Sequence, residues 1–292
     1  MRHFIEPNSF SLEEQLALLD LADRMEADPA PYAHLCDGRI LATLFYEPST
    51  RTRLSFESAM LRLGGKTLGF AGAQLSSASK GETVEDTARV VSNYADVIAM
   101  RHPKEGAPLR ASRYSRIPVI NAGDGGHQHP TQTLTDLMTI RRRMGRLDDL
   151  TIGLCGDLKF GRTVHSLIKT MARCQEHPVR AYQPGRAARA GLHRKGCAGG
   201  QRHPLPGDPQ SGGIHVGAGH PVHDRVQKER FFNEEDYIRL KNSYILTKEK
   251  MDLAKPDMAV LHPLPRVNEI ALDVDDDPRA AYFEQVQNGV YV

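Results

Sequence analysis

The sequence predicts an α/β protein with two domains, each a parallel sheet flanked by helices, joined by a bridging helix. Strand patterns alternate with helical ones along most of the chain, and this alternation is typical of a parallel sheet covered on both faces. The chain has 292 residues, which suits roughly two domains at ~150 residues each. A helical pattern that begins at Pro130, near the middle of the chain, is placed to bridge the two domains.

The first half of the chain begins with a helix and then alternates strands with helices. Ser11 to Met25 predicts an amphipathic helix, because apolar residues recur near helical spacing and Ser11 can cap it. Another helix begins at Ser49 or Thr50 and runs to about Leu63, where a glycine pair ends it. The other elements are strands at Arg39–Tyr46, Thr67–Phe70, Val97–Met100 and Pro118–Asn121, and helices at about Val84–Tyr94 and Leu109–Tyr114.

The second half continues the alternation, with an interruption. The helix from Pro130 runs to about Met144, a strand follows at Thr151–Cys155, and a helix extends from about Arg162 to Arg173. The elements predicted near the end are a helix from residue 233 or 234 to about Lys241, a short extended piece at Tyr244–Leu246, a strand at Met258–Leu261 and a helix around Arg279–Val286.

The interruption runs from Gln175 to Asp224. This segment holds ten glycines, six prolines and six histidines, with few aliphatic residues. Its six basic and three acidic residues give it a formal charge of +3, which leaves −1 for the rest of a chain whose net charge is +2. We expect no strand or helix there, and a structureless stretch of this length is unusual inside a compact domain.

Bulk properties exclude several classes of protein. No apolar run approaches the ~20 residues that cross a bilayer, and the first residues lack the apolar core of a signal peptide. A net charge of only +2 argues against a nucleic-acid surface. We interpret the four cysteines, which lack zinc-like spacing, as free thiols of a cytoplasmic protein without a metal site. They are Cys36, Cys155, Cys174 and Cys197.

The segment from Phe45 to Arg53, Phe-Tyr-Glu-Pro-Ser-Thr-Arg-Thr-Arg, stands where a strand ends and a helix begins. Helix N-termini present unpaired N–H groups and a partial positive charge, so they hold phosphate well. Arg51 adds a fork of donors that matches phosphate oxygens, and the hydroxyls of Ser49, Thr50 and Thr52 add more. Taken alone, the pattern suits either a capped helix with surface arginines or a phosphate site.

A second polar turn, from Asn121 to Gln132, also stands where a strand yields to a helix. His129 and Gln132 are three residues apart, so they share one face of a helical first turn. An imidazole N–H and an amide N–H can both donate to a carbonyl oxygen. The alternative is a polar loop that only caps the helix.

Weaker signals follow other strand ends. Arg101 follows the third strand, where a lone arginine is usually a surface charge. The segment from Ser76 to Glu82 contains glycine and Lys80, and it is either a mobile loop that carries a cation or an ordinary solvated turn. The segment from Gly153 to Arg162 predicts a strand, a turn that contains glycine and the start of a helix. It lacks the full glycine fingerprint and the acidic partner of a dinucleotide site. The last two motifs are Arg225-Val-Gln-Lys-Glu-Arg230 and His262-Pro-Leu-Pro-Arg266.

Together these motifs resemble the transcarbamoylase family in order and spacing, over Ser9 to about Arg173 and again from Arg225 to Val292. The resemblance implies a carbamoyl-phosphate-binding domain at 1–132, towards which 280–292 returns, and an aspartate-binding domain at 133–279. It assigns carbamoyl phosphate binding to Ser49, Thr50, Arg51, Thr52, Ser76, Lys80, Arg101, His129, Gln132, Pro263 and Leu264.

The details resemble the aspartate branch of the family rather than the ornithine branch. Ser76 and Lys80 match a loop that crosses into the neighbouring subunit, and the ornithine branch carries a cysteine where residues 262–266 have none. The resemblance assigns L-aspartate binding to Lys80, Arg162, Arg225, Gln227 and Leu264. Fixed cations suit a dicarboxylate, whereas they would repel a diamino acid.

The implied chemistry is direct transfer of a carbamoyl group from carbamoyl phosphate to L-aspartate, in pyrimidine biosynthesis, with no metal and no organic cofactor. The catalytic residues implied are Arg51, Thr52, Lys80, Arg101, His129 and Gln132. Thr52, Arg101 and His129 would face the carbamoyl oxygen, and Gln132 would contact the carbamoyl amide. Shared active sites imply a homotrimer, with regulatory or dihydroorotase-type subunits as further partners and with no nucleic acid or membrane.

Residues 175–224 depart from the family, although both flanks match it. Their composition is that of GC-rich DNA read out of frame, so we hypothesise a frameshift product with the frame restored near Arg225. The family also continues beyond this chain's end with a helix that packs on the first domain, so we expect a truncated C-terminus. Two alternatives follow: an inactive family member that serves as an oligomer scaffold or binding subunit, and a transcarbamoylase with another amine acceptor.

Overall fold

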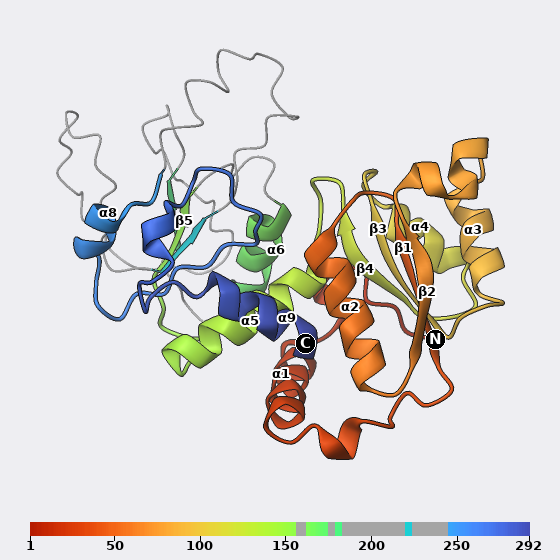
Figure 1. Ribbon diagram of the computed structural model, residues 1–292, viewed down its shortest axis with the longest axis horizontal. Helices are drawn as coiled ribbons and strands as arrows, with labels where there is room; N and C mark the ends of the chain where they lie inside the picture. Colours follow the sequence, from red (N-terminus) through yellow and green to blue (C-terminus); the bar gives the residue numbers. More distant parts are fainter. Residues whose placement is uncertain (156–161, 175–178, 183–219, 224–244) are drawn as a thin grey trace, which may run out of the picture.

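The computed structural model describes residues 1–155, 162–174, 179–182, 220–223 and 245–292, and within them it contains two parallel sheets (Figure 1). The first sheet has the order β2-β1-β3-β4, with every neighbouring pair parallel. Its strands are β1 (Ile40–Phe45), β2 (Lys66–Ala71), β3 (Val97–His102) and β4 (Val119–Asp124). The predicted class, an α/β protein with parallel sheets flanked by helices, is confirmed.

The strand order creates a crevice between β1 and β3. From β1 the chain crosses to β2 on one side and then returns to β3 on the other side. The loops that leave the carboxyl ends of β1 and β3 therefore diverge to opposite sides. In open parallel sheets such a switch point is where ligands bind.

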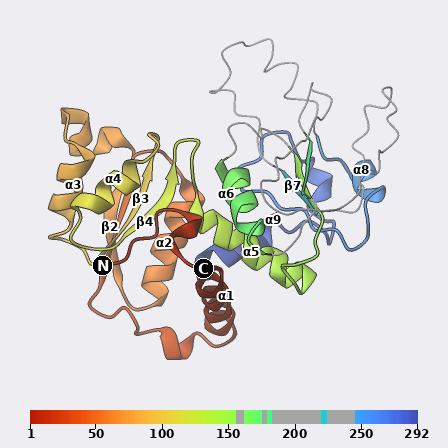
Figure 2. The ribbon, with the colours of Figure 1, turned by 180° about the vertical axis from the view of Figure 1, so that it is seen from behind.

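Helices cover both faces of this sheet. Helix α2 packs on β1 and β2, whereas α4 packs on β3 and β4 with α3 beside it. Figures 1 and 2 show α2 and the α3–α4 pair on opposite faces. The bounds are α1 (Leu12–Ala27), α2 (Thr50–Arg62), α3 (Val84–Val91) and α4 (Ala107–Tyr114).

Local sequence accounts for where α1 begins. The hydroxyl of Ser11 accepts a hydrogen bond from the Glu14 N–H at 3.1 Å, and the Glu14 carboxylate accepts one from the Ser11 N–H at 2.7 Å. This reciprocal capping box satisfies two donors that the helix cannot pair internally. The predicted cap at Ser11 is confirmed.

The second sheet has the order β6-β5-β7, again parallel, with strands β5 (Ile152–Cys155), β6 (Val179–Tyr182) and β7 (His220–His223). Strands β6 and β7 lie inside the 175–224 segment, so the prediction that no strand occurs there is wrong for these residues. Pairing with β5 accounts for both strands, because the ladder satisfies backbone groups whatever the local composition. Pro221 is compatible with β7, since β7 is an outer strand of the three described.

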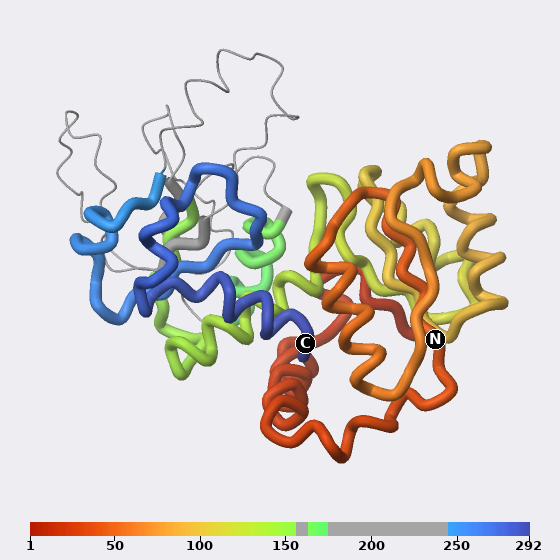
Figure 3. Tube along the Cα trace, in the orientation of Figure 1, coloured from red at the N-terminus to blue at the C-terminus, as the bar shows by residue number. Residues whose placement is uncertain are grey.

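Two long helices connect the halves of the molecule. Helix α5 (Pro130–Met144) has the bounds that the sequence predicts. Helix α9 (Tyr282–Tyr291) packs against α5, α2 and α1, so the last residues lie beside the first helices (Figure 3). Arg141 and Arg142 of α5 form ion pairs with Asp20 and Asp23 of α1 at 2.6 and 2.7 Å, which ties α1 to the bridge.

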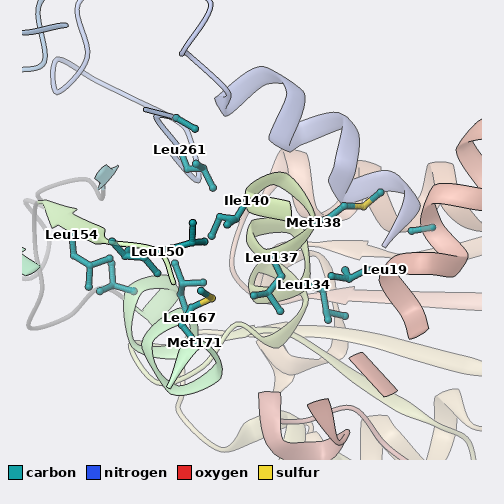
Figure 4. Packing of buried hydrophobic residues seen from close by; sticks show 14 of the residues in the cluster. Leu19, Leu134, Leu137, Met138, Ile140, Leu150, Leu154, Leu167, Met171 and Leu261 are labelled. Carbon is teal, nitrogen blue, oxygen red and sulfur yellow. The ribbon is translucent and has the colours of Figure 1, made fainter. Parts of the chain in front are cut away.

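One apolar core runs through both halves (Figure 4). Helix α6 (Arg162–Met171) and strand β5 pack against α5 from the second half, and α1 packs against α5 from the first. Burial of the apolar side chains that α1, α6 and β5 share with α5 favours the docked arrangement of the two halves. The residues labelled in Figure 4 are Leu19, Leu134, Leu137, Met138, Ile140, Leu150, Leu154, Leu167, Met171 and Leu261.

The predictions near the C-terminus need correction. Within the described residues Met258–Leu261 shows isolated bridges rather than a strand. One bridge is at Val260, which pairs with Ala280, and the other is at Leu261. The last helix begins and ends later than predicted, and α8 (Lys248–Asp252) was not predicted. The helix predicted at 233–241 lies outside the described residues. In the described ranges, no helix combines the length and apolar character needed to cross a bilayer.

Candidate active site

A cavity of about 1110 Å³ opens at the carboxyl ends of β1 and β3, at the switch point, and reaches the loop at 262–265 and helix α9. Nine of the eleven residues predicted to bind carbamoyl phosphate line it; only Ser76 and Lys80 do not. The nine are Ser49, Thr50, Arg51, Thr52, Arg101, His129, Gln132, Pro263 and Leu264. Segments separated by more than two hundred residues in sequence therefore meet at one place.

The first wall of the cavity is the N-terminus of α2. Ser49 holds the N-cap position, with extended backbone, and its side chain makes no capping hydrogen bond. Thr50, Arg51 and Thr52 form the first turn. The N–H groups at the start of the helix and the Arg51 guanidinium give this wall a positive potential that suits a phosphate group. Arg53 points elsewhere, because its Nε donates to the Glu57 carboxylate at 2.7 Å.

Arg101, at the end of β3, is a buried cation with a fixed orientation. Its side chain is only 10% exposed, and Nη2 donates to Oε1 of Glu47 at 2.9 Å. Nη1 lies 3.4 Å from Nε2 of His129. The Glu47 carboxylate holds one branch of the guanidinium fork, so the other branch is directed at the wall that His129 forms.

His129 is the N-cap residue of α5, and this position determines its tautomer. Nδ1 accepts a hydrogen bond from the Gln132 N–H at 3.3 Å. A backbone N–H can only donate, so in the neutral ring the proton lies on Nε2. Nε2–H and Nη1–H of Arg101 are therefore two donors 3.4 Å apart. A ligand oxygen between them would accept from both.

Gln132 lies one helical turn after His129 and lines the same cavity. Its Nε2 donates to Oδ1 of Asp136 at 2.8 Å, and Asp136 is buried. The amide nitrogen is thereby turned into the protein. This leaves the amide oxygen as the group that can meet a ligand.

The loop that begins at His262 forms the opposite wall. The imidazole of His262 accepts from the Leu264 N–H at 2.8 Å through Nδ1, and its Nε2 lies 3.2 Å from Oε1 of Glu269. Leu264 adopts a φ of 52°, a left-handed conformation that costs free energy in a residue with a side chain. The His262 hydrogen bond supports that conformation and so orients the carbonyls of Pro263 and Leu264.

Glu269 anchors this loop as a carboxylate. Burial acts to raise its pKa, but hydrogen bonds from His262 and from the N–H groups of Val267 and Asn268 outweigh burial and lower the pKa to about 2. The ionised form is the one that these donors stabilise.

Ser76 and Lys80 are separated from this cavity within the chain. Lys80 ends the 3₁₀ turn Ser77–Lys80 and is exposed to solvent. The hydroxyl of Ser76 donates to the Ala73 carbonyl at 2.9 Å. The loop therefore presents its cation outward rather than to the chain's own cavity.

The predicted aspartate ligands are only partly described. Arg162 is the first residue of α6, and its side chain lies outside the described part of the chain. Arg225 and Gln227 lie outside the described residues altogether. Leu264 lines the cavity, as stated above.

Three residues that the sequence analysis missed belong to the site or support it. Glu47 forms an ion pair with Arg101. The sequence feature that could have identified it is an acidic residue at a strand end, beside the phosphate motif. Thr163 lines the cavity, next to Arg162, and its buried hydroxyl has no partner among the described residues. The hydroxyl of Ser166 accepts from the His129 N–H at 3.1 Å and donates to Gln128 at 2.9 Å, which no local pattern could reveal.

None of the three described cysteines lines this cavity. Cys36, Cys155 and Cys174 are free thiols, as predicted, and Cys197 lies outside the described residues. Burial raises the pKa of Cys155 to about 12, although Lys250 acts to lower it. A thiol with so high a pKa is protonated and unreactive at neutral pH.

Two family models match the chain. One, described as aspartate/ornithine carbamoyltransferase, carbamoyl-P binding domain, matches residues 2–142. The other, described as aspartate/ornithine carbamoyltransferase, Asp/Orn binding domain, matches residues 220–292. Residues 143–219 lie between the two matched ranges.

Relatives and solved structures match over nearly the whole length. The aspartate carbamoyltransferase catalytic subunit of Lachnoclostridium phytofermentans is 59% identical over all of this chain and 95% of its own length, and that of Bifidobacterium longum is 58% identical over 98% and 89%. The catalytic subunit of M. jannaschii aspartate transcarbamoylase is similar with a TM-score of 0.80 and 39% identity, covering 100% of this chain and 95% of that one. The Trypanosoma cruzi enzyme in complex with carbamoyl phosphate and aspartate has a TM-score of 0.83 and 32% identity, covering 99% and 94%.

Proposed function

This chain belongs to the aspartate/ornithine carbamoyltransferase family, and we propose that it transfers the carbamoyl group of carbamoyl phosphate to the amino group of L-aspartate. The products are N-carbamoyl-L-aspartate and phosphate. One observation carries this proposal: a helix N-terminus suited to phosphate and the donor pair Arg101–His129 line one cavity.

The phosphate group lies at the start of α2. Ser49, Thr50 and Thr52 supply hydroxyls, the helix supplies N–H groups, and Arg51 supplies a charged fork. The positive potential of this site therefore suits a doubly charged phosphate group. Binding there directs the carbamoyl group toward Arg101 and His129.

The carbamoyl oxygen accepts hydrogen bonds from Arg101 and from Nε2–H of His129, with Thr52 as a third donor. Negative charge grows on this oxygen when the amine attacks the carbonyl carbon. Donors that are already oriented stabilise that charge without reorganisation, and each is worth about 3–4 kcal/mol in a favourable site. Glu47 orients Arg101, and the α5 cap orients His129.

The remaining groups orient the carbamoyl nitrogen and the amine. The oxygen of Gln132 accepts from the carbamoyl NH₂ group, and the carbonyls of Pro263 and Leu264 accept from N–H groups of the substrates. The amine attacks the carbonyl carbon directly, the C–O bond to phosphate breaks, and the leaving phosphate takes up the proton that the amine loses. We infer that the transfer is direct, without a covalent enzyme intermediate. Arg162, Arg225 and Gln227 bind the carboxylates of aspartate, with Leu264 and Lys80.

The active sites are shared between subunits of a homotrimer. Ser76 and Lys80 do not line the chain's own cavity, and Lys80 is exposed; this supports their supply to a neighbouring subunit. Regulatory or dihydroorotase-type subunits complete the proposed assembly. The proposed pathway is pyrimidine biosynthesis in the cytoplasm.

We propose domains at 1–132 and 133–279, with 280–292 returning to the first, and we retain the frameshift hypothesis for 175–224. Most of that segment lies in the range that neither family model matches, which supports the hypothesis. Resequencing the gene tests it: an unbroken frame that encodes these same residues refutes it. The same observation favours a second candidate function, an inactive scaffold or binding subunit, because a defective acceptor domain would spare carbamoyl phosphate binding.

One assay separates these functions. The purified chain is incubated with carbamoyl phosphate and either aspartate or ornithine, and carbamoyl phosphate binding is measured in parallel. Transfer to aspartate alone supports the proposed function, and transfer to ornithine or another amine contradicts it. Binding without transfer supports the scaffold.

A further inference from the structure

We propose that the buried pair Asp136–Gln285 sets the orientation of the Gln132 amide, and that the site thereby selects acyl phosphates that carry an N–H donor beside the carbonyl. The inference rests on the proposed function, in which Gln132 meets the carbamoyl NH₂ group. It assigns a specificity role to Asp136, which lies behind the cavity wall, and to Gln285, which lines the cavity beside the loop at 262–265.

The orientation of Gln285 follows from a backbone group of the second half. The His262 N–H donates to Oε1 of Gln285 at 3.0 Å. A backbone N–H cannot accept, so the oxygen of the Gln285 amide must face it. Nε2 of Gln285 then faces Asp136 and donates to its Oδ1 at 2.6 Å. Gln285 is only 2% exposed, so water does not offer it other partners.

The orientation of Gln132 follows in turn. Oδ1 of Asp136 accepts from Gln285, and the same oxygen accepts from Nε2 of Gln132 at 2.8 Å. Asp136 is 2% exposed, and a buried carboxylate needs its donors. Gln132 must therefore turn its NH₂ group inward and its Oε1 toward the cavity. None of the described residues donates a hydrogen bond to that oxygen.

This polarity makes a prediction about ligands. A carbonyl oxygen can only accept, so the group opposite it in a bound acyl phosphate must be a donor. The NH₂ group of carbamoyl phosphate meets this requirement, whereas the methyl group of acetyl phosphate, which has nearly the same size, does not. With the amide flipped, two NH₂ groups would oppose each other, and the preference would disappear.

The test measures dissociation constants of carbamoyl phosphate, acetyl phosphate and inorganic phosphate by calorimetry. The parent prefers carbamoyl phosphate to acetyl phosphate. Gln285→Met fills the same space but does not donate to Asp136. The carboxylate then loses a donor that fixes the position of its Oδ1, so that oxygen can rotate away from Nε2 of Gln132 and the Gln132 amide can flip. We expect the preference to fall roughly 3- to 10-fold, the worth of one net hydrogen bond, with the phosphate affinity unchanged. Gln285→Asn keeps the amide but is too short to reach both partners, and it should reduce the preference as well.

A matched control and a double mutant separate this role from a structural one. Gln287 lies on the same helix and donates to Glu26 at 2.8 Å, but it is exposed, so Gln287→Met should leave the preference unchanged. In the Gln132→Met background, Gln285→Met should have no further effect, because the group that it orients is gone.

Two results would overturn the inference: an unchanged preference in both Gln285 variants, or the same loss with and without Gln132. Transfer to aspartate by the parent is measured separately. A parent that transfers no carbamoyl group to aspartate refutes the proposed function. If the parent is active but the Gln285 variants keep its preference for carbamoyl phosphate, only the role of the Asp136–Gln285 pair is refuted.

Discussion

Arg101→Lys keeps the positive charge at the cavity wall but removes the planar fork. In the parent, Nη2 donates to Glu47 at 2.9 Å while Nη1 lies 3.4 Å from Nε2 of His129. A lysine ammonium is a single point of charge, so it cannot pair with Glu47 and also face the carbamoyl oxygen from the Nη1 position.

The expected loss is that of one oriented donor to the developing oxyanion, about 2.7–4 kcal/mol or 10²–10³-fold in kcat. The retained charge recovers part of this, so we expect kcat to fall about 100-fold. The KM for aspartate should change little, because the proposed function assigns Arg101 to carbamoyl phosphate. Steady-state kinetics of carbamoyl transfer to aspartate measure both.

Arg110→Lys is the matched control. Arg110 is exposed and pairs with Glu85 on the surface, where such pairs are worth about 0–1 kcal/mol. Its kcat should equal that of the parent. A near-parental kcat in Arg101→Lys would show that the fork is not directed at the reacting oxygen and would refute this account of the site.

Other perturbations test the rest of the site. Arg51→Ala should abolish carbamoyl phosphate binding in calorimetry, because an arginine–phosphate pair is lost from a wall built around it, and unchanged affinity would contradict the assignment. Lys80→Ala should be inactive alone yet recover activity in mixed trimers with Arg51→Ala subunits, since one site then keeps both residues; no recovery would argue against shared sites. Glu269, with its pKa lowered to about 2, should stabilise the fold above its unfolded pKa of ~4.3 and lose that contribution, about 3 kcal/mol, as the pH falls toward 2. Denaturant titrations near pH 6 and near pH 3 measure the free energy of unfolding. Its decrease between these two pH values should be smaller in Glu269→Gln than in the parent, and an equal decrease would contradict this linkage.

Sequence patterns alone determined the elements whose signals are local. The capping box at Ser11, the proline that opens α5 and the strand–helix alternation each depend on residues a few positions apart, and the structure has these features where they were predicted. The motif from Ser49 to Arg53 and the turn at His129 were found for the same reason, because a strand end and a helix start are visible in the sequence.

Tertiary structure alone decided which distant groups meet. Glu47 holds Arg101 across 54 positions, Ser166 supports His129 across 37, and Gln285 reaches Asp136 across 149. Strands β6 and β7 arise from pairing with β5 rather than from their own composition. The physical reason is that a local pattern encodes contacts within a turn or a cap, whereas these hydrogen bonds exist only because packing around α5 brings separate elements together and excludes the water that would otherwise compete for the same polar groups.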